Sequence, residues 1–193
     1  MNESEAGERE LARIESAAAA PQDGNAPKGA PRDCGHFDIH IDRDGSWFYR
    51  GTPINRASLT RLFSTVLERD EAGVFWLVTP VERGRVTVDD APFMAIELDR
   101  VGEGHDQELI FRTNVGDSVT LDAAHPLRIE TDPTTQTPRP YVLVRKKLEA
   151  RLARPVFYAL VEMGTEERVG AEAQFGVWSK GTFFPLGLLT DGL

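Results

Sequence analysis

The stretch VTVDDAPFMAIEL, residues Val86–Leu98, places two adjacent aspartates between two runs that are rich in apolar residues. Neighbouring side chains of an extended strand point to opposite faces, so Asp89 and Asp90 cannot both reach one reacting centre while a strand continues. The proline two residues after them disfavours a helix, and aspartate side chains stabilise turns by accepting backbone N–H groups. We therefore predict a strand that ends at Val88, an aspartate-stabilised corner and a new strand from Phe93. A catalytic carboxylate pair is the alternative.

The segment GHFDIHIDRDGSWFYRG (residues 35–51) is typical of a β-hairpin. Apolar and polar residues alternate, as on a strand with one buried face. The DRDG sequence suits a type I turn followed by a glycine bulge, which sets Ile41 against Trp47. Phe48 then shares the second face with His40. A two-residue turn would exchange the faces.

Three segments predict helices. The first has apolar residues at helical spacing that form one stripe, Leu59, Leu62, Phe63, Val66 and Leu67. Gly73 is expected to cap the C-terminus of this helix. In RPVFYALVEMG (residues 154–164), Pro155 suits the first helical turn, so we favour helix over strand for residues 155–163. The segment YVLVRKKLEARLAR (residues 141–154) starts extended and turns helical.

The segment FGVWSKGTFFPLG (residues 175–187) is expected to form a second hairpin. A three-residue SKG loop would set Val177 against Phe183, which leaves Trp178 and Phe184 together on the second face. The whole pattern predicts an α+β protein with mostly antiparallel sheets, hairpin-plus-helix units and two small subdomains, residues 34–113 and 114–193. Residues 1–33 contain few large apolar side chains and are expected to form a disordered, partly helical tail.

Composition excludes several classes of protein. The chain has 193 residues, a formal net charge of −9 and 40% hydrophobic residues, as in an ordinary globular protein. Its negative charge disfavours nucleic acid as a partner, and no apolar run is long enough for a membrane span. The lone Cys34 cannot form an internal disulfide, and the N-terminus is acidic where a targeting peptide would be basic. We therefore expect a cytoplasmic protein.

Many segments of the chain resemble a bacterial family, domain of unknown function 1285. The resemblance rests on DGSWFYRGTPI, LFSTVL, FWLVTPVERGRVTVDDAPF, FRTNVGD, HPLRIE, PYVLVR and GVWSKGTFFPLG, and it spans nearly everything from Phe37 to Gly187. It implies a compact bacterial α+β protein with two subdomains. It implies no known reaction, and a regulatory or signalling role is a reasonable expectation for such a family.

Motifs of catalysis are largely missing from the sequence. It lacks a phosphate-binding loop and a nucleophile elbow, and we predict no catalytic residues, bound metal or cofactor. The best metal candidate is HFDIHID, where His36, Asp38, His40 and Asp42 would project from one strand face and could chelate zinc. An amphipathic strand has the same alternation on its wet face, and we favour that interpretation.

Aromatic residues on the second faces of the two hairpins suggest a binding surface. We predict that Phe48, Trp178 and Phe184 border a cleft, with Arg112 as an anion contact; burial of the aromatic residues under helices is the alternative. The favoured function is a non-enzymatic regulatory or ligand-binding module, for a small molecule or a protein partner. The alternative is a small hydrolase or metal-dependent enzyme that uses Asp89, Asp90 and a histidine. The sequence leaves the oligomeric state open.

Overall fold

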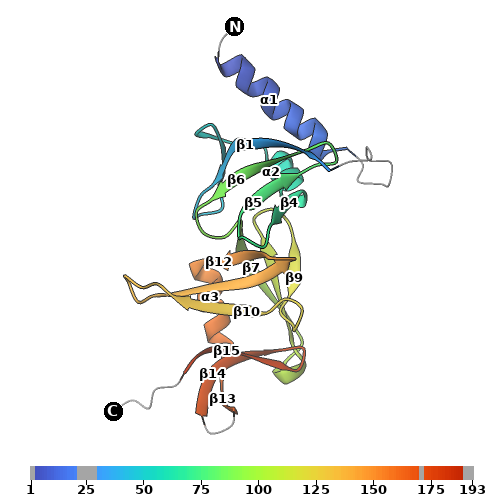
Figure 1. The fold of residues 1–193 in the computed structure, drawn as a ribbon. Helices are drawn as coiled ribbons and strands as arrows, with labels where there is room; N and C mark the ends of the chain where they lie inside the picture. Colours follow the sequence, from blue (N-terminus) through green and yellow to red (C-terminus); the bar gives the residue numbers. More distant parts are fainter. Residues whose placement is uncertain (1–2, 21–29, 170–171, 189–193) are drawn as a thin grey trace. The chain divides into compact units, whose positions relative to one another are not determined.

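The computed structural model describes residues 3–20, 30–169 and 172–188, which fold into two compact units of the α+β class (Figure 1). The first unit is Met1–Pro92 with Lys146–Leu148, and the second is Phe93–Arg145 with Glu149–Leu193. The division therefore lies at Pro92 and Phe93, and not between residues 113 and 114 as we expected. The reason is strand pairing, because the strand that begins at Phe93 pairs with strands of the second unit. None of the helices among the described residues is long and apolar enough to cross a membrane.

The N-terminal unit is built on a six-stranded sheet with the order β3-β2-β1-β6-β5-β4. Its elements are α1 (Glu3–Ala18), β1 (Arg32–Ile41), β2 (Trp47–Tyr49), β3 (Thr52–Pro53), α2 (Ala57–Thr65), β4 (Leu67–Arg69), β5 (Phe75–Val78) and β6 (Glu82–Val88). β1 and β6 are parallel, and the other neighbours are antiparallel. One face of the sheet buries apolar side chains, among them Ile39 and Ile41, together with Leu59 and Phe63 of α2.

The first hairpin has the register that the turn chemistry predicted. Ile41 pairs with Trp47 and His40 with Phe48, and Gly45 takes a positive φ of 75° at the bulge. The predicted strand ends at the corner are also confirmed, because β6 ends at Val88 and β7 begins at Phe93, and the stabilisation of the corner by aspartate stays a prediction. Helix α2 is shorter than we predicted. The chain leaves it after Thr65 and forms β4, so that Gly73 lies in the turn between β4 and β5.

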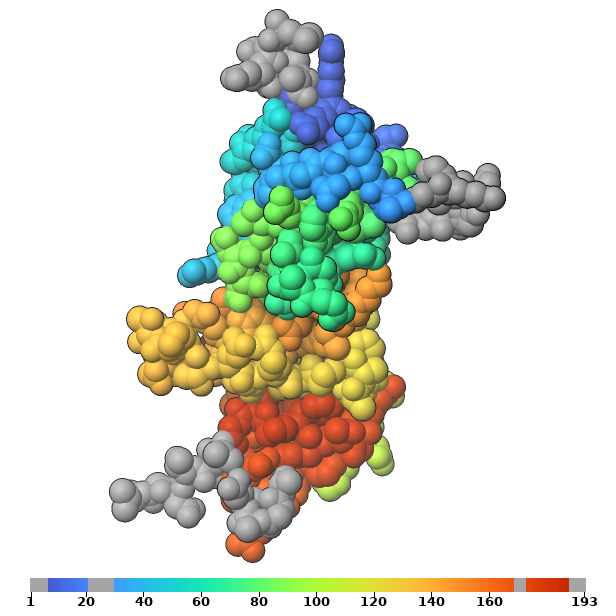
Figure 2. Space-filling model, viewed as in Figure 1, coloured from blue at the N-terminus to red at the C-terminus, as the bar shows by residue number. Residues whose placement is uncertain are grey.

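Residues 3–18 form a docked helix where we expected a disordered, partly helical tail over residues 1–33. Ile14 of α1 is fully buried and Ala18 is almost so. The apolar stripe of α1 is too narrow to stand out in the sequence, and the helix depends on charged groups of distant strands that no local pattern reveals. In the space-filling view α1 lies against the β1–β3 segment, with which its side chains bond (Figure 2).

The C-terminal unit contains two sheets. Its elements are β7 (Phe93–Val101), the 3₁₀ turn η1 (Gly104–Asp106), β8 (Glu108–Thr113), β9 (Ser118–Thr120), β10 (Leu127–Thr131), β11 (Pro138–Arg145), β12 (Leu148–Leu152), α3 (Arg154–Glu162), β13 (Thr165–Val169), β14 (Glu172–Ser179) and β15 (Thr182–Leu188). The larger sheet has the strand order β10-β11-β12-β7-β8-β9, and the smaller sheet has the order β13-β14-β15. Strand β12 runs parallel to β7. The helix predicted for residues 155–163 is confirmed as α3, which buries Val156 and Leu160.

Two predictions for the C-terminal unit were wrong because the turns differ. The segment 141–154 contains most of β11 and all of β12, and helix begins only at Arg154; Lys146 takes a φ of 49° in the turn, and alternate residues of β12 are buried. The second hairpin uses a two-residue turn, Lys180–Gly181, with positive φ at both positions. A primed turn of this kind matches the twist of the strands. Its register pairs Val177 with Phe184, and Trp178 with Phe183.

The loop that joins β10 to β11 provides a pH-dependent prediction. The backbone N–H groups of Thr135 and Thr134 donate to Asp132, and together with Arg139 they lower the pKa of its carboxyl to about 2. The folded state thus favours the ionised form, so the stabilisation is complete above the usual pKa of 3.8 and is lost as the pH falls through about 2. In denaturant titrations, the stability difference between the natural chain and Asp132→Ala should shrink between about pH 4 and 2. An equal difference at about pH 6 and 2 would contradict this.

Candidate functional site

A pocket of about 360 Å³ lies within the N-terminal unit, between α1, the β2–β3 turn and the start of α2. Gly7, Glu8 and Leu11 of α1 form one wall. The remaining lining residues are Tyr49, Arg50, Thr52, Pro53, Ile54, Asn55, Arg56 and Leu59. Pockets of this size hold small molecules, and this one combines an apolar lining with a few convergent polar groups.

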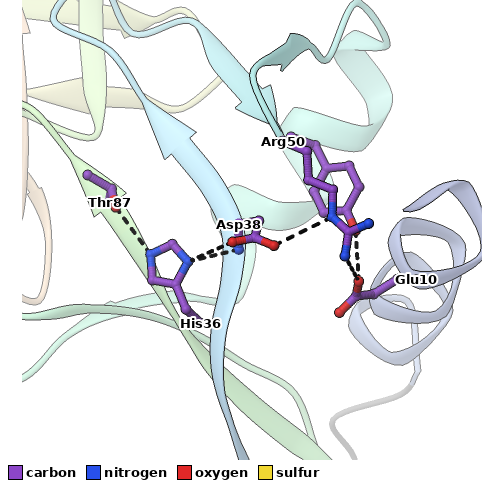
Figure 3. A network of polar contacts seen from close by, with 6 residues as sticks. Glu10, His36, Asp38, Arg50 and Thr87 are labelled. Carbon is purple, nitrogen blue, oxygen red and sulfur yellow. Dashed lines mark hydrogen bonds and ion pairs between the residues drawn. The ribbon is translucent and has the colours of Figure 1, made fainter. Parts of the chain in front are cut away.

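The β2–β3 turn places Arg50 at the pocket. Tyr49 pairs with Thr52, so the connection is a two-residue turn, in which Arg50 has a φ of 48° and Gly51 of 77°. A positive φ suits glycine but is costly for arginine. Arg50 keeps this conformation because a two-residue turn with positive φ matches the twist of the strands on either side. The Arg50 side chain extends from the turn toward Glu10 of α1 (Figure 3).

A chain of polar contacts links α1 to the open face of the sheet (Figure 3). Arg50 Nη2 donates to Glu10 Oε2 at 2.7 Å, and Arg50 Nε lies 3.5 Å from Asp38 Oδ2. His36 Nδ1 accepts the backbone N–H of Asp38 at 2.9 Å, and its Nε2 lies 3.2 Å from Thr87 Oγ1. These contacts orient the Arg50 guanidinium from both sides.

The hydroxyl group of Tyr49 donates to the same Glu10 carboxylate at 3.0 Å. Burial of the phenol, followed by this hydrogen bond and the Glu10 charge, raises the pKa of Tyr49 to about 12. Tyr49 therefore stays neutral at physiological pH; its one O–H is given to Glu10, and it offers the pocket its ring.

Arg56 provides the second cation of the pocket. It precedes α2, and its two Nη atoms donate to the Glu15 carboxylate of α1 at 3.3 and 2.8 Å. A guanidinium has five N–H donors, so these bonds leave donors for a ligand on both arginines. The lining thus contains two guanidinium groups against the single carboxylate of Glu8. Each guanidinium is also paired with a carboxylate of α1 outside this lining, Glu10 for Arg50 and Glu15 for Arg56, so an anion in the pocket would use the remaining N–H donors of the two arginines.

The four residues that we predicted at a binding cleft lie in both units. Phe48 belongs to the N-terminal unit, where it stacks on His40 with ring centroids 5.9 Å apart. The other three belong to the C-terminal unit. Arg112 bonds to Asp99 at 2.7 Å and lies 3.5 Å from Glu97, on an exposed surface.

Trp178 and Phe184 lie on opposite faces of β14–β15, which corrects the shared face that we predicted. Trp178 stacks on His105 at 4.1 Å, and its Nε1 donates to Glu167. Phe184 is buried and pairs with the buried Val177. The shift of one residue in the turn causes this exchange of faces.

Asp89 of the corner contacts a histidine of β1. Asp89 Oδ1 lies 2.9 Å from His40 Nε2, with both side chains about two-fifths exposed.

The β1 strand is irregular, since Gly35 and Asp38 have positive φ, and its register with β6 shifts around His36. Its histidines therefore take different partners, Asp38 for one and Asp89 for the other. Within the described ranges, no three metal-ligating side chains come together.

Sequence reasoning missed the pocket because its walls come from distant segments. Only one local signal was present, the recurrence of Leu11, Ile14 and Ala18 at positions i, i+3 and i+7 of a helix. The arginines gave no signal, because a paired surface arginine looks the same in a sequence as one that lines a pocket.

Two family models match the chain in consecutive stretches. The domain of unknown function DUF1285, N-terminal domain, matches residues 27–91, and the protein of unknown function DUF1285, C-terminal domain, matches residues 92–186. A crystal structure of a DUF1285 family protein from Silicibacter pomeroyi DSS-3 is 46% identical, with a TM-score of 0.78, over 90% of this chain and 93% of that chain. A second, from Shewanella baltica OS155, is 26% identical with a TM-score of 0.53, over 65% and 91%. No curated protein matches the chain.

Proposed function

The chain belongs to the DUF1285 family, and we propose that it is a non-enzymatic regulatory module that binds a small amphipathic anion in its N-terminal unit. The family models name no reaction, so the proposal depends on the site itself. The observation that carries it is the pocket of about 360 Å³ with Arg50 and Arg56 in its lining. Guanidinium groups bind carboxylates and phosphates by paired hydrogen bonds, which makes an acidic group the expected head of the ligand.

The rest of the lining defines the remainder of the ligand. Leu11, Pro53, Ile54 and Leu59 offer apolar contacts, and Thr52 and Asn55 add polar groups. A short aliphatic or aromatic acid would satisfy both parts of such a pocket, with its charge at the arginines and its apolar end against these side chains. Because α1 supplies one wall, occupancy of the pocket and docking of α1 are coupled, which is the property that a regulatory module needs.

The alternative function, a small hydrolase or metal-dependent enzyme, has one contact in its favour. His40 and Asp89 are within hydrogen-bonding distance, as the histidine and carboxylate of an acid–base pair would be. Both side chains are substantially exposed, however, and an enzyme site needs convergent groups in a pocket. The pocket described above has neither residue in its lining. The binding module therefore remains the proposal.

Octanoate tests the proposal, with octanamide as a neutral control of similar shape. Isothermal titration should show binding of octanoate and at least about tenfold weaker binding of octanamide, because charge-assisted hydrogen bonds to Arg50 and Arg56 need the carboxylate. Arg56→Gln should weaken the binding of octanoate by about tenfold, whereas Arg112→Gln in the C-terminal unit should leave it unchanged.

Glu15→Gln separates a direct contact from an effect through the helix. This change frees Arg56 from its carboxylate partner and should tighten the binding of octanoate, opposite in sign to Arg56→Gln. If both changes weaken binding equally, Arg56 acts only by holding α1. If octanoate and octanamide bind alike, or if Arg112→Gln alone abolishes binding, the proposed anion pocket is wrong.

A further inference from the structure

Helix α1 is attached to the N-terminal unit by a specific pattern of contacts. Ile14 and Ala18 are buried at the centre of the contact face. Charged side chains flank them, and each meets an opposite charge on the unit. The ion pairs are Glu10 with Arg50, Arg13 with Glu82 and Glu15 with Arg56. Such a row of alternating charges around an apolar centre can define both the register and the direction of a helix in a groove.

The family model includes the surface that receives α1, which we call the groove and which contains Arg50, Arg56 and Glu82, but it does not include α1. The N-terminal family model starts at residue 27, so α1 lies outside it, whereas the three groove residues that receive the charges lie inside it. Residues 19–31 between α1 and β1 include the sequence PQDGNAPKGAP, which has the composition of a linker. The receptor surface thus lies within the match to the family model, and α1 precedes that match.

The groove contains one group that demands a specific partner. Glu82 is 5% exposed as a residue; its Oε2 bonds to Arg13, and its Oε1 finds no hydrogen-bond partner among the residues that the structure describes. Cys34 Sγ lies 3.5 Å from the same Oε2. A buried carboxylate is costly without a cation, so a helix that fills this groove needs a basic residue at the position of Arg13.

From these contacts we infer that the groove is a docking site for an amphipathic helix of a protein partner, and that α1 is its intramolecular occupant. The contacts define the partner's chemistry as Glu-x-x-Arg-Ile-Glu-x-x-Ala, the pattern of residues 10–18. The occupant is a helix because the contacts recur at helical spacing, and it is acidic at its flanks because the groove supplies Arg50 and Arg56. A partner helix competes with α1, whose tether gives it a high local concentration. This inference concerns the helix and stands without the small-molecule pocket.

The test uses the full chain with a protease recognition sequence inserted within residues 21–29. The folded chain is cut there, and a fluorescent synthetic peptide of residues 1–20 is added to it in place of the natural fragment. Fluorescence anisotropy should show saturable binding. The Arg13→Met peptide should bind at least about tenfold more weakly, because it leaves Glu82 without its cation. The Ile14→Asp peptide should show no binding, and the Arg9→Met peptide, which loses an exposed guanidinium, should bind like the natural one.

Each other outcome would overturn the inference. A cut chain that stays folded but does not bind the peptide has no helix-docking groove. A cut chain that unfolds shows that α1 is an obligatory part of the core and cannot be exchanged. Equal weakening by Arg9→Met and Arg13→Met would reduce the binding to nonspecific charge. If the uncut chain forms a dimer by exchange of α1, then the occupant is a second copy and the partner is wrong.

Discussion

Replacing Arg13 by methionine should lower the free energy of unfolding of the N-terminal unit by about 2 kcal/mol. The change removes the cation from Glu82, whose side chain is only 6% exposed and which then remains as a buried charge. Breaking a fully buried ion pair costs about 3–5 kcal/mol. We expect the smaller loss of about 2 kcal/mol because the Arg13 side chain is half exposed and therefore partly hydrated already. Urea titration followed by tryptophan fluorescence measures the loss. A Trp178→Phe background leaves Trp47 and Trp76, both in this unit, as reporters.

Two variants identify the cause of that loss. Arg9→Met removes an exposed guanidinium from the same helix and should change stability by less than about 0.5 kcal/mol. Glu82→Gln removes the buried charge, so Arg13→Met in this background should cost less than about 1 kcal/mol. If Arg13→Met costs the same with either residue at position 82, the stabilisation comes from helix packing alone and the ion pair contributes nothing.

A second large effect is expected from Gly84→Ala in β6. A Cβ atom at Gly84 would lie 2.5 Å from Cγ of Phe37, well inside van der Waals contact. Phe37 is 1% exposed, so its ring has no open space into which it can move. Overpacking of this severity should cost about 3 kcal/mol, at the upper end of what such changes cause in cores. The same urea titration measures it.

The double variant provides the control for that prediction. Phe37→Leu removes the ring that the new methyl group would meet, so adding Gly84→Ala to it should cost less than about 1 kcal/mol. An equal cost of Gly84→Ala in both backgrounds would show that the damage comes from the β6 backbone and not from contact with Phe37.

Local chemistry predicted those parts of the fold where a short pattern decides the conformation. The DRDG turn specifies both the bulge at Gly45 and the pairing of Ile41 with Trp47. Pro155 and the apolar spacing after it were sufficient for α3. The same reasoning failed at Lys180, because nothing in the sequence indicates that this lysine takes a positive φ. The observed two-residue turn, Lys180–Gly181, is one residue shorter than the SKG loop that we predicted.

The candidate site was beyond prediction for a different reason. Arg50, Arg56 and Glu82 lie 40, 41 and 69 residues from their partners on α1, and what they share is contact with that helix. The helix has little stability of its own, so its propensity gave no hint that it would dock. Phe48 and Trp178 were sensible choices because they are aromatic and half-buried, yet each is already stacked on a histidine of its own unit.

The two parallel strand pairs have a consequence for how the chain folds during synthesis. β1 pairs with β6, so the central pair of the first sheet cannot form until Val88 has left the ribosome. β7 pairs with β12, so the central pair of the second sheet must wait for Leu152. Long-range pairing of this kind is slow, because the loop between the strands must close before the pairing stabilises anything. Nascent β1 and β7 therefore expose unpaired edges for much of translation, and chaperones that bind extended apolar segments would meet the chain at these two strands first.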